Sequence, residues 1–175
     1  MTQVELAAYV QTHLASEGIQ VVLSGGSAVS YYVGDLYVSK DIDLIAEFAP
    51  KKAALKHAMA AIGFENEARY YTHPQSNHII EILPGPISVG DQPVTETREI
   101  ELATGTLRIL TPTDAVKDRL AAYFYWNDAQ ALQQALWIGN LNRIDLTEIE
   151  RWAQREKKTD KFTEFRQSLK STPPP

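Results

Sequence analysis

The sequence predicts an α/β protein, with an α/β half at about 1–110 and a helical half at about 111–170. Up to residue 110, short runs rich in β-branched residues alternate with segments that carry a helical apolar stripe. After residue 111 only the helical pattern continues, with capping signals at 111–114 and 145–148. The length of 175 residues suits one domain, or one domain with a small helical extension.

The chain begins with a predicted helix, strand and turn. Residues 4–16 carry an apolar stripe, and Gly18 is expected to end this helix in the left-handed conformation. Residues 19–24 are apolar and β-branched, which predicts a buried strand. The glycines at 25–26 predict a tight turn, and a short helix over 27–32 is expected to follow with its first residue as N-cap.

The rest of the α/β half predicts further strands, one helix and a hairpin. In chain order these are strand 41–47, helix 51–62 ended by Gly63, strand 64–71 paired with strand 78–83, and hairpin strands 94–102 and 106–110. In the helical half, N-caps are expected at Thr111 and Asp145. A helix between them is expected to begin near Asn127 or Asp128 and to be ended by Gly139-Asn140. The segment 160–170 is weakly amphipathic, and 171–175 is expected to be a disordered tail.

Composition excludes several classes of function. The net charge of −5 argues against binding nucleic acid through bulk positive charge, although a local basic patch could still dock one RNA end or one nucleotide. The absence of cysteine excludes disulfides, thiol catalysis and Cys-ligated zinc. We expect a cytoplasmic protein with no membrane partner, because the sequence carries neither a signal-peptide pattern nor an apolar run of spanning length.

Asp41 and Asp43 form an Asp-x-Asp pair on a predicted strand. Side chains two apart on a strand point to the same face, roughly 7 Å apart at their Cα atoms. Two carboxylates on one face raise each other's pKa unless a cation lies between them, and Mg²⁺ favours one or two carboxylates together with substrate phosphates. An isolated pair of this kind is more often solvent-facing at an edge strand, so the pair alone does not identify a site.

Gly25, Gly26 and Ser27 follow a predicted strand and open a predicted helix. Glycine lets the backbone approach a ligand, and a helix N-terminus offers N–H groups and positive dipole to a phosphate. By itself the same tripeptide is also typical of a plain strand-to-helix turn.

Taken together, the two tripeptides resemble the signature of the nucleotidyltransferase fold shared with the DNA polymerase β superfamily. The matching residues are Gly26, Ser27, Asp41 and Asp43, with thirteen residues from 28 to 40 as the spacer. The stretches VLSGGSAVSYY, YVSKDIDLI, an internal His-x-x-Glu-x-x-Pro-Gly and TPTDAVKDRLAAYFYWND resemble small bacterial nucleotidyltransferase-like proteins related to abortive-infection and toxin–antitoxin enzymes. This resemblance covers most of residues 19–138.

The resemblance implies a mixed sheet flanked by helices and a metal-dependent enzyme that moves an NMP from an NTP to an acceptor hydroxyl. Asp41, Asp43 and a third carboxylate would be the catalytic ligands of Mg²⁺ or Mn²⁺. The candidate third acid is Glu81, which lies among apolar neighbours in NHIIEIL, where an unpaired buried carboxylate would be costly. The family more often has Asp at this position, so Glu81 departs from its pattern.

The resemblance also implies how the triphosphate is bound. Gly25, Gly26 and Ser27 would bind the β- and γ-phosphates through backbone N–H groups and the serine hydroxyl. The further candidate cations are Lys40, Lys117 and Arg119, although a charge in such a position is more often a solvated surface charge.

Three hypotheses remain open from the sequence. The first is a nucleotidyltransferase whose acceptor is a tRNA or other RNA end, a protein hydroxyl or a small molecule. The second is a catalytically inactive module of the same fold that binds a nucleotide or a protein. The third, which rests on the family resemblance alone, is a toxin–antitoxin or phage-defence component with a cognate antitoxin protein.

Overall fold

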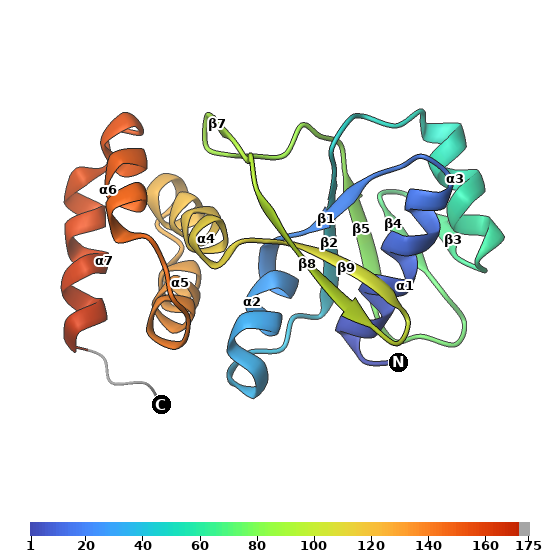
Figure 1. Ribbon diagram of the computed structural model, residues 1–175, viewed down its shortest axis with the longest axis horizontal. Coiled ribbons are helices and arrows are strands. Elements are labelled where there is room, and N and C mark those ends of the chain that lie inside the picture. Colours follow the sequence, from blue (N-terminus) through green and yellow to red (C-terminus); the bar gives the residue numbers. More distant parts are fainter. Residues whose placement is uncertain (172–175) are drawn as a thin grey trace.

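The computed structural model describes residues 1–171 (Figure 1). Its helices are α1 Gln3–Ser16, α2 Gly25–Val33, the 3-10 helix η1 Gly34–Leu36, α3 Lys52–Ala61, α4 Pro112–Trp126, α5 Ala129–Leu141, α6 Leu146–Arg155 and α7 Thr159–Ser171. Its strands are β1 Val21–Leu23, β2 Asp41–Ala46, β3 Glu65–Glu67, β4 Tyr70–Thr72, β5 Ile79–Leu83, β6 Ser88–Val89, β7 Gln92–Pro93, β8 Thr97–Leu102 and β9 Gly105–Leu110. Ser171, the first residue of the predicted tail, ends α7, and residues 172–175 lie outside the described residues.

Within the described residues, the main sheet has the strand order β3-β4-β5-β2-β1-β9-β8. Strand β2 pairs with β5 in parallel and with β1 in antiparallel, while β1 pairs with β9 in parallel. The predicted fold class is therefore confirmed: a mixed sheet flanked by helices, followed by a helical part.

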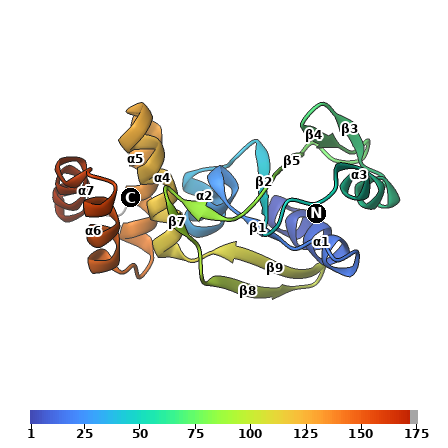
Figure 2. The same cartoon turned by 90° about the horizontal axis from the view of Figure 1, so that it is seen from above.

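The helical part lies at one end of the molecule. Figure 1 shows α4 to α7 on one side of the sheet strands, and α1, α3 and the β3–β4 hairpin on the other side. The view from above in Figure 2 gives the same separation, with α2 next to α4. Helix α1 packs along β9 and β1, and α2 contacts β2, α4 and α5. Helix α2 thus lies between the sheet and the helical part.

Side-chain caps account for several helix starts, among them the predicted cap at Thr111 and one at Thr2 that was not predicted. Thr2 forms a full capping box with Glu5 at the start of α1, and Gly18 follows that helix at φ 76°. Thr111 accepts a hydrogen bond from the Asp114 backbone N–H at the start of α4. Each threonine side chain accepts a hydrogen bond from a first-turn backbone N–H that has no partner within the helix.

The start of α2 differs from the prediction. The helix begins at Gly25, its N-cap is Ser24, and it runs to Val33. Ser27 is therefore not the N-cap but a buried residue of the first turn. The reason is that Gly25 adopts φ 58° and turns the chain into the helix, so that the N-cap lies three residues before the predicted Ser27.

Two further boundaries were also wrong. The single strand expected over 64–71 is a hairpin, because Ala68 adopts φ 57° and reverses the chain between β3 and β4. Helix α5 continues through Gly139 to Leu141 instead of ending at the glycine. A Cβ added at Gly139 would lie 2.8 Å from Leu169 of α7, so this glycine serves helix packing rather than helix termination.

One hydrophobic cluster includes buried residues from both halves of the chain. Leu23, Ile42 and Ile80 contribute from the sheet, and Phe124 and Trp152 contribute from the helical part. The two aromatic rings stack with centroids 5.3 Å apart. This buried cluster spans the boundary near residue 110. The division into separate domains at 1–110 and 111–170 therefore remains a prediction.

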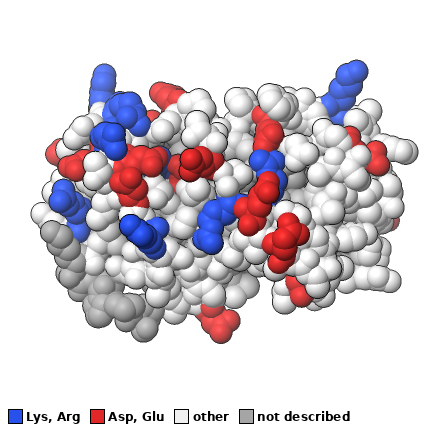
Figure 3. Space-filling model, viewed as in Figure 1, with Lys and Arg blue, Asp and Glu red and all other residues white. Residues whose placement is uncertain are grey.

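The surface shows no broad region of one charge on the face drawn in Figure 3, where acidic and basic side chains are interspersed. This agrees with a chain of 17 basic and 22 acidic residues. Among residues 1–171, no helix combines the length and apolar character that crossing a bilayer requires.

Candidate active site

The two tripeptides meet in the structure at the junction of β1, α2 and β2. The Gly26 backbone N–H donates to Asp43 Oδ2 at 3.1 Å. The Asp43 backbone N–H donates to Ser27 Oγ at 3.0 Å, and Ser27 Oγ donates to the Ser24 carbonyl at 2.9 Å. The first turn of α2 therefore holds both the backbone and the carboxylate of Asp43.

Both glycines are needed for the close packing of the turn against Asp43 and against the loop before β2. A Cβ at Gly25 would collide with the Asp43 carboxylate, and the φ of 58° is itself unfavourable for other residues. A Cβ at Gly26 would lie 2.9 Å from Ser39 Oγ and 3.1 Å from Tyr37 Oη. The loop between the tripeptides thus closes over the turn, and any side chain there would push it away.

The acidic residues lie on neighbouring strands. Asp43 is in register with Glu81 across the parallel β2–β5 pair, and Asp41 is in register with Ile79. Residues in register share a face of the sheet, so the carboxylates of Asp41, Asp43 and Glu81 belong to one face while Ile42 is buried behind them. The structure therefore brings the predicted acidic residues to one face.

Burial raises the pKa of Asp43 to about 6. The Arg119 guanidinium and the Gly26 N–H lower this pKa, whereas the charges of Glu81 and Asp41 raise it further. The charged form of Asp43 is thus only partly compensated by the protein, and a bound cation would relieve this condition.

Arg119 is the predicted cation that the structure brings to Asp43. It extends from α4, is largely buried, and pairs with Asp118 at 2.6 Å. Burial lowers the pKa of Arg119, but the negative charges of Asp118 and Asp43 outweigh burial and leave the pKa raised. Its charge therefore acts on the acidic face from the helical part.

Lys117, two residues earlier on α4, pairs with Asp114 and Glu148 and not with the acidic residues of the sheet. Its side chain is 1% exposed and its Nζ contacts Asp114 Oδ1 at 3.0 Å and the Glu148 carboxylate of α6. The expectation that Lys117 binds nucleotide is corrected here, because its ammonium group is enclosed in a buried ion-pair set that joins two helices. Lys40 is exposed at the bend before β2, and its role stays a proposal.

The Ser27 hydroxyl already has hydrogen-bond partners within the protein. It is buried, its hydrogen is donated to Ser24, and it accepts from Asp43. The phosphate contact expected from this hydroxyl is therefore replaced by a positioning role for Asp43. What the turn can offer to an anion is backbone N–H groups at the start of α2 other than that of Gly26, which already donates to Asp43.

Sequence reasoning missed two residues on the same face. Arg69 Nε lies 3.4 Å from Glu81 Oε1, and Tyr70 is in register with Glu81 across the β4–β5 pair. Both residues belong to the hairpin that was expected to be a single strand. A turn signal at Ala68 could have identified them, but alanine is an uncommon residue at positive φ.

The carboxylates are not arranged as a closed metal cluster. In the described part of the chain, no three His, Cys, Asp or Glu side chains come together in a way that could hold a metal ion. Asp43 and Glu81 are side by side as a register pair, and Glu81 already has a cationic partner in Arg69.

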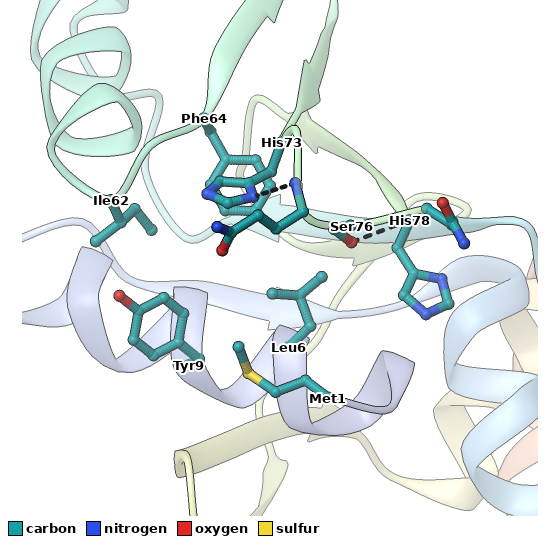
Figure 4. Close-up of a pocket in the computed structure, with 10 residues that line it drawn as sticks. Met1, Leu6, Tyr9, Ile62, Phe64, His73, Ser76 and His78 are labelled. Atoms are coloured by element: carbon teal, nitrogen blue, oxygen red, sulfur yellow. Dashed lines mark hydrogen bonds between the residues drawn. The ribbon is translucent and has the colours of Figure 1, made fainter.

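A cavity of about 380 Å³ lies between α1 and the segment that connects β4 to β5 (Figure 4). Phe64, His73 and Tyr9 line it, and His73 Nδ1 accepts a hydrogen bond from the Gln75 backbone N–H. His78 is one residue from Ile79, so alternation assigns it to the face opposite the acidic residues. The cavity is therefore separate from the acidic face.

Comparison with known proteins identifies the fold. No protein-family model matches the sequence, and no curated protein matches it. Among solved structures, an antigenic nucleotidyltransferase-like protein from Paracoccidioides brasiliensis aligns with a TM-score of 0.59 at 13% identity, covering 78% of this chain and 75% of that chain.

The antibiotic-resistance factor ANT(2'')-Ia is similar in two further structures. Its solution structure aligns with a TM-score of 0.55 at 14% identity, covering 97% of this chain and 92% of that chain. Its crystal structure in complex with adenylyl-2''-tobramycin aligns with a TM-score of 0.51 at 16% identity, covering 96% and 99%. At these identities the likeness establishes the fold, which is nucleotidyltransferase-like.

Proposed function

Because the fold is nucleotidyltransferase-like, we propose that the chain transfers an NMP from an NTP to an acceptor hydroxyl. The observation that carries the proposal is the register pair Asp43–Glu81 beside a glycine turn that donates directly to Asp43. Nucleotidyl transfer needs little covalent work from a protein, because positioning and charge neutralisation supply most of the catalysis. The acidic face and the open start of α2 match those two requirements.

The donor set fits a divalent cation. Carboxylate oxygens are the ligands that Mg²⁺ and Mn²⁺ prefer, and Asp43 has a raised pKa that such a cation would lower again. We propose that Asp43 and Glu81 hold the cation as a pair and that Asp41 joins them with substrate bound. When bound, the cation would neutralise charge on the attacking and leaving oxygens of the transfer.

The remaining contacts are proposed for the triphosphate. The backbone N–H groups at the start of α2, other than that of Gly26, which already donates to Asp43, would donate to its phosphate oxygens. Arg119 would add a positive charge from α4, because its charge already acts on Asp43. Lys40 is a further proposed cation, since it is exposed at the bend before β2.

The acceptor is proposed as a class, a hydroxyl on an RNA end, a protein or a small molecule. The complex of ANT(2'')-Ia with adenylyl-2''-tobramycin supports including a small molecule among these. A toxin–antitoxin or phage-defence role with an antitoxin partner, and a cytoplasmic location, are kept as proposals that rest on sequence.

The experiment is transfer of α-labelled ATP, CTP, GTP or UTP in a cell extract with Mg²⁺, followed by separation into RNA, protein and small-molecule fractions. We expect label in one fraction, and a loss of at least 100-fold with Asp43→Asn, since a positioned charge contributes on that order. An exposed control, Glu96→Gln in the loop before β8, should retain activity. Label that survives Asp43→Asn, or label in no fraction, would contradict the proposal.

A second candidate is a nucleotide-binding module without turnover. Two observations favour it: the described residues hold no closed three-residue metal cluster, and Glu81 is already paired with Arg69. Tight nucleotide binding without transfer in the same extract would support this candidate over the enzyme.

A further inference from the structure

Arg69 lies at the end of a row of side chains that crosses the acidic face. Asp43 of β2 is in register with Glu81 of β5, and Glu81 is in register with Tyr70 of β4. Residues directly opposite on neighbouring strands have adjacent side chains on one face. Arg69 immediately precedes Tyr70, in the two-residue turn that closes the β3–β4 hairpin.

Two residues hold the Arg69 side chain in this position. Its Nε lies 3.4 Å from Glu81 Oε1, and its guanidinium carbon lies 4.8 Å from the centre of the Tyr70 ring. Its Nη2 also donates to the Tyr70 hydroxyl. The Arg69 side chain is nevertheless 70% exposed, whereas the Glu81 side chain is only 15% exposed. A largely exposed cation is therefore paired with a mostly buried carboxylate.

The same carboxylate is a proposed metal ligand. A divalent cation between Asp43 and Glu81 would need a Glu81 lone pair, and its charge would repel a guanidinium held at that oxygen. Arg69 can leave without disturbing the core, because it extends from an exposed turn and its partners, Glu81, Tyr70 and the more distant charge of Asp41, lie on the acidic face.

We propose that Arg69 is the built-in counter-ion of Glu81 in the metal-free protein, and that a divalent cation must displace it to bind. This inference rests on the proposed function, because it requires that Glu81 is a metal ligand. The displaced guanidinium is then free at the rim of the site. Arg69 acts on metal binding through Glu81, so it is a positioning residue rather than a catalytic one.

The test is Mn²⁺ affinity, measured by the electron paramagnetic resonance signal of free Mn²⁺. Arg69→Gln should bind Mn²⁺ about two- to fivefold more tightly than wild type, which is the range for loss of one exposed competing ion pair. Arg69→Lys should change affinity less. The matched control is Arg166→Gln, which removes an exposed arginine paired with Glu150 in the helical part and should leave affinity unchanged.

The direction of the effect separates this role from a structural one, because a damaged site would bind Mn²⁺ more weakly. Unchanged or weaker binding by Arg69→Gln, with Mn²⁺ bound by wild type, overturns the inference alone. If wild type and every variant bind no Mn²⁺, the metal dependence in the proposed function fails first, and the inference fails with it.

A second measurement uses the full-length protein without substitution. The NMR signal of the Arg69 Nε–H group reports its ion pair directly, and Mg²⁺ should shift this signal toward that of a free arginine. A signal that does not change while Mg²⁺ binds at Asp43 would contradict displacement.

Discussion

At the residue scale, opposing effects act on the pKa of Asp43. The Gly26 N–H and the Arg119 charge favour its ionised form, but burial outweighs both and raises its pKa to about 6. A carboxylate of this kind lowers the stability of the metal-free protein at neutral pH, and it is the type of group that binding a cation would compensate.

The pH dependence of stability follows from this pKa. In the unfolded chain Asp43 titrates near pH 4, so between about pH 4 and 6 the folded protein retains a proton that the unfolded chain has lost. The stabilising contribution of protonated Asp43 is fully present below about pH 4 and is lost as the pH rises through 6.

Asp43→Asn should therefore be more stable than wild type at pH 8 by about 2–3 kcal/mol, with the difference vanishing toward pH 4. Urea unfolding in the presence of EDTA at pH 4 to 8 measures this, with Glu96→Gln as the exposed control. Parallel pH profiles for wild type and Asp43→Asn would show that Asp43 is not a destabilising charge.

Lys117 shows where residue-level sequence reasoning stops. Its neighbourhood in sequence suggested either a phosphate ligand or a solvated charge, and both assume an accessible ammonium group. The structure buries it against Glu148, 31 residues further along the chain. No local pattern contains that partner, since it depends on how α6 packs against α4.

At the scale of elements, helix starts with strong capping signals were predictable and turns at positive φ were not. Thr111 caps α4 as expected because its side chain and the following proline are local features. The start of α2 was misplaced because Gly25 turns the chain before Ser27 can cap it, and the hairpin at Ala68 was missed because no glycine marks it. Arg69 was missed together with that turn.

The turn at Gly25 offers a sharp test because Gly18 provides a matched control. Both glycines have positive φ, 58° and 76°, but a Cβ at Gly18 meets nothing within 4 Å, whereas one at Gly25 meets the Asp43 carboxylate. Gly18→Ala should cost about 1 kcal/mol of unfolding free energy, the backbone effect alone. Gly25→Ala should cost about 2–3 kcal/mol because the collision adds to it.

Activity should separate the two variants further. Gly25→Ala displaces Asp43 and should lose nucleotidyl transfer, while Gly18→Ala should retain it. Equal losses of unfolding free energy, measured by urea denaturation, would mean that the Asp43 carboxylate does not depend on the glycine.

At the scale of the whole molecule, the site is assembled from three separate segments. The family resemblance predicted that the glycine turn and Asp43 belong to one site. It also made Glu81, on a later strand, the candidate third acid. Their side-by-side register depends on the order β5-β2-β1, which includes a parallel pair whose strands are far apart in sequence. Alternation predicted the shared face of Asp41 and Asp43, but it could not predict the neighbouring strand.

The helical part completes the molecule and supplies Arg119. The Trp152 indole N–H donates to the Val89 carbonyl at 3.2 Å, and the Asn142 side chain donates to the Tyr32 carbonyl at 3.1 Å. These contacts hold α6 and the end of α5 against the α/β half, and α4 itself contacts α2, β6 and β9. The charge of Arg119 therefore reaches Asp43 only while both halves are packed together.

Calorimetric binding of a non-hydrolysable NTP analogue, with and without Mg²⁺, tests whether the two tripeptides form one nucleotide site. Asp43, Glu81 and the start of α2 act as one site in this account, so binding should require Mg²⁺ and should weaken at least tenfold in Asp43→Asn, about 1.4 kcal/mol. Glu96→Gln should bind like wild type. Binding that is equally tight without Mg²⁺ and in Asp43→Asn would contradict the claim that the two tripeptides form one nucleotide site.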